Sequence, residues 1–411
     1  MKNKQLIDHL FRHQFGKMVA ILTRIFGLKN LETVEDAVQD TFVLAMLKWR
    51  DQIPKNPEAW LTKAAKNRAI DLLRKIKAEG NRFEKIEHGL SVTTLDELFL
   101  DYQIADSQLR MIFTACHPDL HAKDQIAFAL KTVAGFSTKE IASALLLKED
   151  TVKKRLSRAR KSIQEKHIAF DFPDKKDVPS RLERVYEVLY LIFNEGFHSN
   201  HQKVLIRQDL CGEALRLTKL VLSKPELRTG SGYALFALMC FHAARLESKM
   251  SENGKPIDLK HQDRSKYHFP LIKLGNEAMN KAMQYGDTST YHIEAAIAVE
   301  HLKAKSFAAT NWEKILKLYK QLYEINGDEM TKLNIIIVLL QLQQNVRAKV
   351  LLDNINPTIL EQRVYLFWGV KAEYYINIGQ KEKAIDALNR AIEKTSNQVE
   401  KDYLSQKKET L

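Results

Sequence analysis

The stretch STKEIASALLLKEDTVKKRLSRARKSI, residues 137–163, decides the fold around it because it predicts two amphipathic helices separated by a very short break. Ser137 and Glu140 have the spacing of a capping box, which marks the start of the first helix. An apolar stripe with helical spacing runs along the second helix: Val152, Leu156, Ala159 and Ile163. Two helices joined this tightly predict a helix-turn-helix.

The opposite face of the second helix is strongly basic, since residues 151–167 hold seven Lys or Arg and one Glu. The candidate DNA contacts on this face are Lys153, Lys154, Ser157, Arg158 and Lys161. Such a helix can lie in the major groove, where cationic side chains reach phosphates and guanine edges. A solvated charged face is the ordinary alternative. The capping box, the short break and the basic helix together favour DNA binding.

Composition limits the number of domains, the kind of partner and the cysteine chemistry that the chain can have. A chain of 411 residues with 45% hydrophobic residues predicts two or three domains, and its net charge of +13 favours an acidic partner. The three cysteines, Cys116, Cys211 and Cys240, are far apart and predict neither a disulfide framework nor a zinc ribbon. No signal peptide or membrane-spanning run is evident, so we expect a soluble cytoplasmic protein without a membrane partner.

Residues 31–50, LETVEDAVQDTFVLAMLKWR, predict a helix with two different faces. One is an apolar stripe for the core: Val34, Val38, Phe42, Ala45 and Trp49. The other mixes acidic and apolar side chains and is a candidate docking surface for a basic protein partner: Asp36, Gln39, Asp40, Val43 and Leu47. The alternative is a helix that is buried on both sides.

Asn56 and Pro57 predict the start of another helix, as N-cap and first-turn proline. Its core side is expected to hold Leu61, Ala65, Ala69, Leu72 and Ile76. The candidate DNA-binding residues of this helix are Trp60, Lys63, Lys66, Asn67 and Arg74. Cations that hold phosphates, next to an aromatic ring, form the combination that grips unstacked single strands.

The rest of the chain also reads as helical, so the expected fold class is all-α. A connection without clear periodicity precedes a short helix at 107–114, and another helix follows at 123–133. Adjacent Cys116 and His117 are weak evidence for a metal site, because no further ligand follows at a suitable spacing. A second polar set also matches no ligand or catalytic motif: Glu195, His198, His242, His261 and Asp263.

In this order the elements resemble a bacterial RNA polymerase sigma factor of the extracytoplasmic-function (sigma-70) type. The resemblance covers about residues 6–167 and is carried by EDAVQDTFVLAMLKW, PEAWLTKAAKNRAIDLLRK and the helix-turn-helix. It implies that 35–49 contact the clamp helices of the largest subunit of core RNA polymerase. It further implies that 57–77 melt and read the minus-ten element of promoter DNA, with Asn67 placed to hydrogen-bond a flipped base, and that 137–163 read the minus-thirty-five element. One departure is Lys148, which replaces the usual capping residue before the recognition helix.

The remaining 240 or so residues resemble the C-terminal extension of one sigma subgroup, in strings such as RMIFTACHPDL, YLIFNEGF and YHIEAAIAVEH. Residues 362–395 also resemble a tetratricopeptide helix pair, with small residues where helices would touch: Ala372, Gly379, Ala384, Ala387 and Ala391. Such helical repeats bind proteins, so we expect the extension to regulate through an intramolecular or partner contact. The expected domains are a region 2-like domain at 1–79, a linker at 80–105, a region 4-like domain at 106–170 and a tetratricopeptide-like extension at 180–411.

The resulting hypothesis is a sigma factor that binds core polymerase and directs promoter-specific initiation, with no catalysis, cofactor or metal of its own. The alternative is a helix-turn-helix transcriptional regulator with a repeat sensor domain that works without polymerase. The chain lacks a P-loop, a dinucleotide-binding glycine pattern and a nucleophile elbow.

Overall fold

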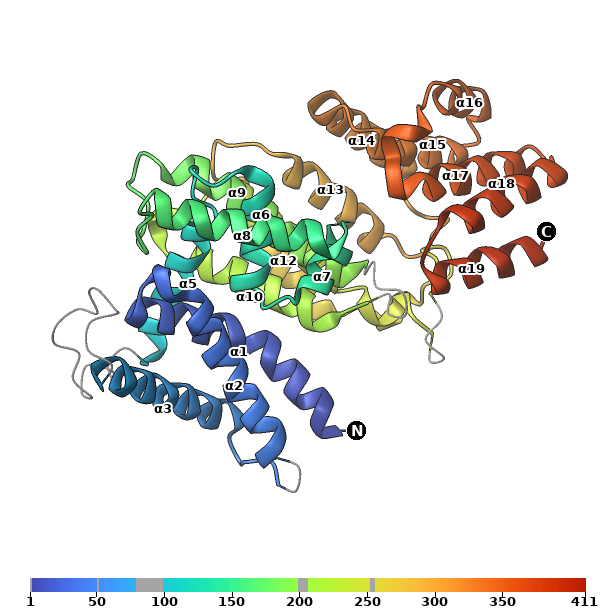
Figure 1. Cartoon of the computed structure of the whole chain (residues 1–411). Coiled ribbons are helices and arrows are strands. Elements are labelled where there is room, and N and C mark those ends of the chain that lie inside the picture. Colours follow the sequence, from blue (N-terminus) through green and yellow to red (C-terminus); the bar gives the residue numbers. More distant parts are fainter. Residues whose placement is uncertain (1, 50–51, 79–98, 146, 199–205, 252–255) are drawn as a thin grey trace. The chain divides into compact units, whose positions relative to one another are not determined.

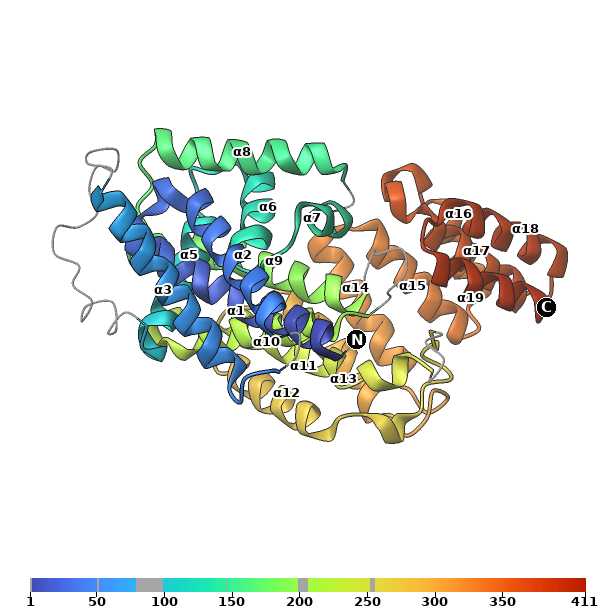
Figure 2. The same cartoon turned by 60° about the horizontal axis from the view of Figure 1, so that its bottom comes forward.

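The computed structural model describes residues 2–49, 52–78, 99–145, 147–198, 206–251 and 256–411, shown in two views in Figures 1 and 2. Within these residues the chain consists of helices and turns, apart from one isolated bridge between Met250 and Pro256. The expected all-α class is confirmed. None of the helices described has both the length and the hydropathy that a membrane span requires.

The chain divides into two compact units, of which the first comprises 1–193 and 212–227 and the second 194–211 and 228–411. The first contains α1 (Lys2–Phe26), η1 (Leu28–Asn30), α2 (Leu31–Lys48), α3 (Pro57–Ala78), α5 (Asp101–Ala115), α6 (Ala122–Thr132), α7 (Thr138–Ala144), α8 (Glu149–Glu165), η2 (Pro225–Leu227) and most of α9 (Val178–Phe197) and α10 (Gln208–Ser223). Helices α9 and α10 lie within the expected extension, yet they belong mainly to the unit that holds the sigma-like segments.

Helices α1, α2 and α3 pack against one another because each turns an apolar stripe inward (Figure 1). The predicted stripe of α2 is confirmed, since Val34, Val38, Phe42, Ala45 and Trp49 are all at most 4% exposed. In α3, Leu61, Ala65 and Ala69 are fully buried and Leu72 is half-buried, while the side chain of Ile76 lies outside the described residues. Asn56 caps α3 by accepting a hydrogen bond from the backbone of Ala59 at 3.0 Å.

The helix-turn-helix is formed by α7 and α8, which pack on each other and on α6 (Figure 2). The capping box of Ser137 and Glu140 is present. The predicted stripe of α8 is buried throughout: Val152, Leu156, Ala159 and Ile163. Lys148 is the N-cap of α8. Its side chain forms no capping hydrogen bond, as expected for a lysine in place of the usual capping residue.

Helix α5 is longer than the sequence indicated, because it begins at Asp101 rather than at Ser107. The hydroxyl of Ser107 donates to the carbonyl of Gln103 at 2.8 Å, a bond inside a helix rather than a cap at its start. Residues 101–105 of the expected linker are therefore helical, and 79–98 lie outside the described residues.

The second unit continues with α11 (Gly230–Ala243), η3 (Leu246–Lys249), η4 (Arg264–Lys266), α12 (Phe269–Ala282), α13 (Thr290–Lys303), α14 (Trp312–Asn326), α15 (Glu329–Gln341), α16 (Asn345–Asp353), η5 (Pro357–Arg363), α17 (Val364–Asn377), α18 (Lys381–Lys394) and α19 (Gln398–Glu409). From α13 to α19 each helix packs on its neighbour in the chain, in the manner of helical repeats. A core of Ile, Leu and Val joins α14, α15 and α16.

The α17–α18 pair has small residues at its contact, as expected: Ala372, Ala384, Ala387 and Ala391 are all buried. Gly379 is an exception to the expectation. It is exposed and lies in the turn after α17 with φ of 73°, a backbone conformation that suits glycine. Its role is to end the helix rather than to let two helices touch.

Candidate nucleic-acid and protein interfaces

The mixed acidic and apolar face of α2 is exposed, which excludes a helix buried on both sides. Its five predicted members are all exposed: Asp36, Gln39, Asp40, Val43 and Leu47. Leu44 and Met46, at 40% and 49% exposed, widen the same surface beside Val43 and Leu47, at 54% each. Large apolar side chains gathered in water on one helix are typical of a surface that a partner protein covers. Periodicity does not single out Leu44 and Met46, because no polar residue interrupts 42–47 to mark its exposed side.

Asp40 of this face also holds α3, since its carboxylate accepts a hydrogen bond from Arg68 at 2.7 Å. Both side chains are exposed to solvent, so the pair adds little stability. Asp36 forms no ion pair with any described residue. It is therefore the simpler position at which to test the charge of the face.

The predicted DNA-binding residues of α3 differ in their surroundings. Lys63 and Asn67 are exposed one turn apart, while Lys66 is half-buried. The half-buried ring of Trp60 packs edge to face on Trp49, with centroids 5.2 Å apart. Trp60 therefore helps to join α2 to α3, and its exposed part lies on the same helix as the cations. Arg74 belongs to α3, but its side chain is outside the described residues.

The predicted face of α8 is exposed at all five positions: Lys153, Lys154, Ser157, Arg158 and Lys161. Two of its lysines have loose acidic neighbours on their own helix, because Lys153 lies 3.6 Å from Asp150 and Lys161 lies 3.6 Å from Glu165. Pairs of this kind between exposed groups exchange easily for other anions. The face can therefore turn its cations toward phosphates.

Arg158 is held in place by a residue that the sequence did not single out. Its Nε and Nη2 donate to the two carboxylate oxygens of Asp124 on α6, at 3.0 and 2.8 Å. Asp124 is only 5% exposed, while the Arg158 side chain is 60% exposed. A bidentate pair of this kind orients the guanidinium on the outer face of α8. No local pattern could have revealed a partner 34 residues earlier in the chain.

Arg160, also on α8, contacts α2 instead of facing outward. Its Nη2 donates to Glu35 Oε2 at 2.7 Å, and its Nη1 lies 3.1 Å from Glu32 Oε1. Burial raises the pKa of Glu35, while the Arg160 guanidinium acts to lower it. These contacts line a hollow of about 320 Å³ that has Asp36 and Gln39 on one side and Lys153 on the other. The N-terminal part of the exposed α2 face thus lies beside α8.

Helix α1 packs against the turn between α6 and α7. Their backbones approach each other closely at Gly16 and Val133. A Cβ atom on Gly16 would lie 2.1 Å from the carbonyl oxygen of Val133. Gly135, with φ of 68°, packs on the ring of Phe15 in the same way. Only glycine allows backbones this near, so the sequence itself fixes the region 2-like helices on the region 4-like ones.

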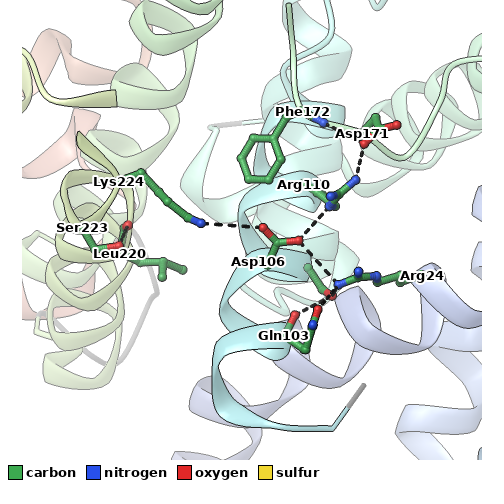
Figure 3. Close-up of polar contacts among 10 residues, drawn as sticks. Arg24, Gln103, Asp106, Arg110, Asp171, Phe172, Leu220, Ser223 and Lys224 are labelled. Carbon is green, nitrogen blue, oxygen red and sulfur yellow. Dashed lines mark hydrogen bonds and ion pairs between the residues drawn. The ribbon is translucent and has the colours of Figure 1, made fainter. Parts of the chain in front are cut away.

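A polar network around Asp106 joins three further parts of the first unit (Figure 3). The carboxylate of Asp106 accepts a hydrogen bond from Arg110 at 2.9 Å and lies 3.5 Å from Arg24 Nη1 and 3.9 Å from Lys224 Nζ. Arg110 also pairs with Asp171 and stacks on the Phe172 ring at 5.2 Å. Helices α1, α5 and the end of α10 therefore converge on one carboxylate.

A second, buried carboxylate ties α10 to the same helices. Glu213 is 1% exposed and accepts hydrogen bonds from Arg216 at 2.7 and 2.9 Å, and His13 Nδ1 lies 3.1 Å away. Burial alone would raise the pKa of Glu213, but the hydrogen bonds from Arg216 and His13 lower it. Arg216 also donates to Gln108 of α5 at 3.2 Å. A helix of the expected extension, α10, is thus anchored on the sigma-like helices.

The residues considered for catalysis or metal binding are engaged in local contacts or are buried in the fold. His261 pairs with Asp258 at 2.7 Å, and Asp263 caps η4 through Ser265. Burial raises the pKa of all three cysteine thiols to about 12: Cys116, Cys211 and Cys240. In the described part of the chain no three His, Cys, Asp or Glu side chains gather closely enough to hold a metal ion.

The helix-turn-helix with its basic outer face, the cationic α3 and the exposed face of α2 are together typical of a helical DNA-binding protein with a protein-docking surface. Comparison with known families narrows this class. A model for sigma-70 region 2 matches residues 10–79, and a model for sigma-70 region 4 matches 110–163. The chain therefore contains segments that match both of these regions of sigma-70 factors. Residues 181–283 match a family of unknown function, DUF6596.

Two curated relatives show how far the likeness extends. An uncharacterized protein of Rhizobium meliloti (strain 1021) is 29% identical over 384 residues, which cover 92% of this chain and 89% of the relative. The ECF RNA polymerase sigma factor SigE of Mycolicibacterium smegmatis is 24% identical over 159 residues, or 38% of this chain and 60% of the relative. No solved structure matches the chain significantly.

Proposed function

We propose that this protein binds core RNA polymerase through the exposed face of α2 and directs initiation at promoters that it reads with α3 and α8. The observation that carries the proposal is the exposed acidic and apolar face of α2, in the same compact unit as the helix-turn-helix. A regulator that works without polymerase does not require such a face. The protein supplies contacts and DNA opening and carries out no covalent chemistry.

Under this proposal α2 contacts the clamp helices of the largest polymerase subunit. Lys63, Asn67 and Trp60 hold and unstack the minus-ten element, where flipped bases are recognised by stacking and hydrogen bonds. Lys153, Lys154 and Lys161 bind phosphates or base edges of the minus-thirty-five element. The contacts of Glu213 and Lys224 with α1 and α5 support a regulatory role for the extension, because they link it to the helices behind both DNA-binding surfaces.

Charge reversal on α2 tests polymerase docking. We expect the double variant Asp36→Lys and Asp40→Lys to lose affinity for core polymerase by at least about 10-fold, because like charges then face a basic partner. The measurement is a titration of labelled protein with core enzyme. Glu313→Lys with Glu324→Lys on α14 is the control, since both positions are exposed and the change in net charge is the same. Equal affinity in the docking variant would favour the polymerase-independent regulator.

Salt dependence tests the α8 face. We expect Lys161→Ala to weaken binding of a polymerase–protein complex to promoter DNA and to reduce the slope of log K against log salt by about 1, because one phosphate contact releases about one counterion. Arg158→Ala should act in the same direction and also leave the buried Asp124 carboxylate without its partner. Lys219→Ala on α10 is the exposed control. An unchanged slope in Lys161→Ala would argue against direct phosphate contact.

A further inference from the structure

A group of cationic and imidazole side chains gathers within the second unit, where the ends of several helices meet. We name it the Arg245 cluster, and its members are His198, His242, Arg245, Lys249, Arg264 and His301. His198 follows α9, Arg245 and Lys249 follow α11, and His301 lies in the last turn of α13. The rings of His198 and His242 both contact Phe197, with centroids 4.7 and 4.9 Å away.

Two cations of the cluster, Arg245 and Lys249, have neutral partners. Arg245 donates from Nε and Nη2 to the side-chain oxygen of Gln262, at 3.2 and 2.9 Å. Lys249 donates to the carbonyl of Phe197 at 2.9 Å, and its Nζ lies 3.4 Å from the centre of that residue's ring. In the part of the chain that the structure describes, neither cation forms an ion pair with a carboxylate. Buried charges without a counterion are costly and therefore rare in proteins.

Nearby carboxylates are engaged elsewhere. Glu300, which precedes His301, is held by Lys303 and Lys314 at 2.6 Å each. Asp263, which precedes Arg264, accepts hydrogen bonds from Ser265. Burial lowers the pKa of Lys249 most, and the positive charge of Arg245 lowers it further. Arg245 and Lys249 therefore lack a carboxylate partner among the described residues.

Two polar atoms of the cluster are also buried without a hydrogen-bond partner among the described residues. Arg264 is anchored through Nη1, which donates to the carbonyls of His301 and Ala304 at 2.5 and 2.7 Å. Its Nη2 is buried without a hydrogen-bond partner among the described residues, and so is Nδ1 of His301. Polar atoms that are buried and unpaired call for a specific explanation, such as a bound ion.

The negative ends of helix dipoles offset only part of the positive charge of the Arg245 cluster. Lys249 and Arg264 donate to carbonyls at the ends of α9 and α13, where the helix dipole supplies about half a negative charge. The helix dipoles offset part of the positive charge of Lys249 and Arg264. They do not offset the charge of Arg245, which donates to an amide oxygen. Burial lowers the pKa of Lys249 to about 7 and that of His242 to about 3, so the cluster reduces its charge where a side chain can lose a proton.

We propose that the Arg245 cluster is a binding site for a small ligand that carries a phosphate group. Phosphate brings two negative charges or nearly so and three acceptor oxygens, which match a guanidinium, an ammonium and unpaired N–H donors. Because Lys249 is buried and Arg245 is half-buried, the ligand must be small, and a nucleic-acid backbone does not fit. The site is separate from the promoter-reading faces of the first unit, and the proposal does not depend on their function.

The test uses the full-length chain and measures its thermal unfolding during titration with inorganic phosphate or AMP, at constant ionic strength. We expect the unfolding temperature of the unaltered protein to rise with ligand concentration, because a ligand that binds only the folded state stabilises it. Lys249→Met and the gentler Arg245→Lys should each weaken binding by at least about 10-fold. Lys320→Met, at an exposed lysine of α14, should leave it unchanged.

The two ligands distinguish the source of the phosphate group. A response to phosphate alone indicates a free oxyanion site, whereas a stronger response to AMP indicates that the ligand is a phosphomonoester. Calorimetry in two buffers of different ionisation enthalpy adds a readout that a structural role would not change: binding near pH 7.5 should take up protons, and Lys249→Met should abolish that uptake. The absence of any response to either ligand would overturn the proposal, and so would responses in Lys249→Met and Arg245→Lys that equal the response of the unaltered protein.

Discussion

Replacing Val43 and Leu47 with aspartate is expected to reduce the affinity for core polymerase on the order of 100-fold. Each side chain is 54% exposed in the free protein and would be covered in the complex. Burial of the exposed half of two such side chains contributes roughly 2–3 kcal/mol, and aspartate adds a desolvation cost, so the sum corresponds to about two orders of magnitude in Kd. The variant should fold normally because neither position belongs to the core.

The chain offers a closely matched control for this variant. Val346 and Val350 on α16 have the same spacing and are 81% and 56% exposed. Val346→Asp with Val350→Asp should bind core polymerase with unchanged affinity. Equal losses in both double variants would mean that added negative charge, and not the α2 face, causes the effect.

Gly16→Ala is expected to separate the region 2-like helices from the region 4-like ones. The added Cβ would lie 2.1 Å from the Val133 carbonyl oxygen, and a backbone atom cannot move aside cheaply. Overpacking of this kind costs about 1–3 kcal/mol. In a unit of this size that corresponds to a loss of roughly 2–10 °C in the unfolding temperature of the first unit, which differential scanning calorimetry measures.

The same variant should promote promoter binding once polymerase is present. A compact unit of about 200 residues is roughly 45 Å across. Promoter elements about 25 base pairs apart are separated by roughly 85 Å, at about 3.4 Å per base pair. If α3 and α8 bind the two elements as proposed, they must move apart on DNA, and the contacts of Gly16 and of Arg160 with Glu35 oppose that movement. We expect open-complex formation by Gly16→Ala to increase about 10-fold.

Gly212→Ala is the matched control for Gly16→Ala. Gly212 also lies inside a helix, but its Cβ would meet no atom within 4 Å. Alanine should stabilise α10 by about 0.5–1 kcal/mol and leave promoter binding unchanged. If Gly16→Ala unfolded at the temperature of the unaltered protein, the tight contact between α1 and the α6–α7 turn would not exist in solution.

Local patterns predicted much of the first unit because helix periodicity and capping depend on neighbouring residues. The stripes of α2 and α8 and the capping box of Ser137 follow this rule. Ser107 shows where prediction from local patterns fails. A serine hydroxyl bonds to the backbone equally well at a helix start and within a helix. Gly379 shows a second failure of such prediction, because a small residue can lie either in a contact between helices or in a turn.

Contacts between distant segments could not be predicted in this way. Arg160 and Glu35 are 125 residues apart, and Arg158 differs from Arg160 only by its place on the helix circumference. Nothing in the sequence distinguishes the arginine that faces outward from the one that holds α2. The exposure of Leu44 and Met46 likewise depends on which neighbours cover α2.

Run-off transcription from a promoter template with purified core polymerase and full-length protein tests the central claim most directly. We expect promoter-specific transcripts with the unaltered protein, normal amounts with Val346→Asp and Val350→Asp, and almost none with Val43→Asp and Leu47→Asp. Promoter-specific transcripts that persist at normal levels in the last variant would contradict polymerase docking through α2.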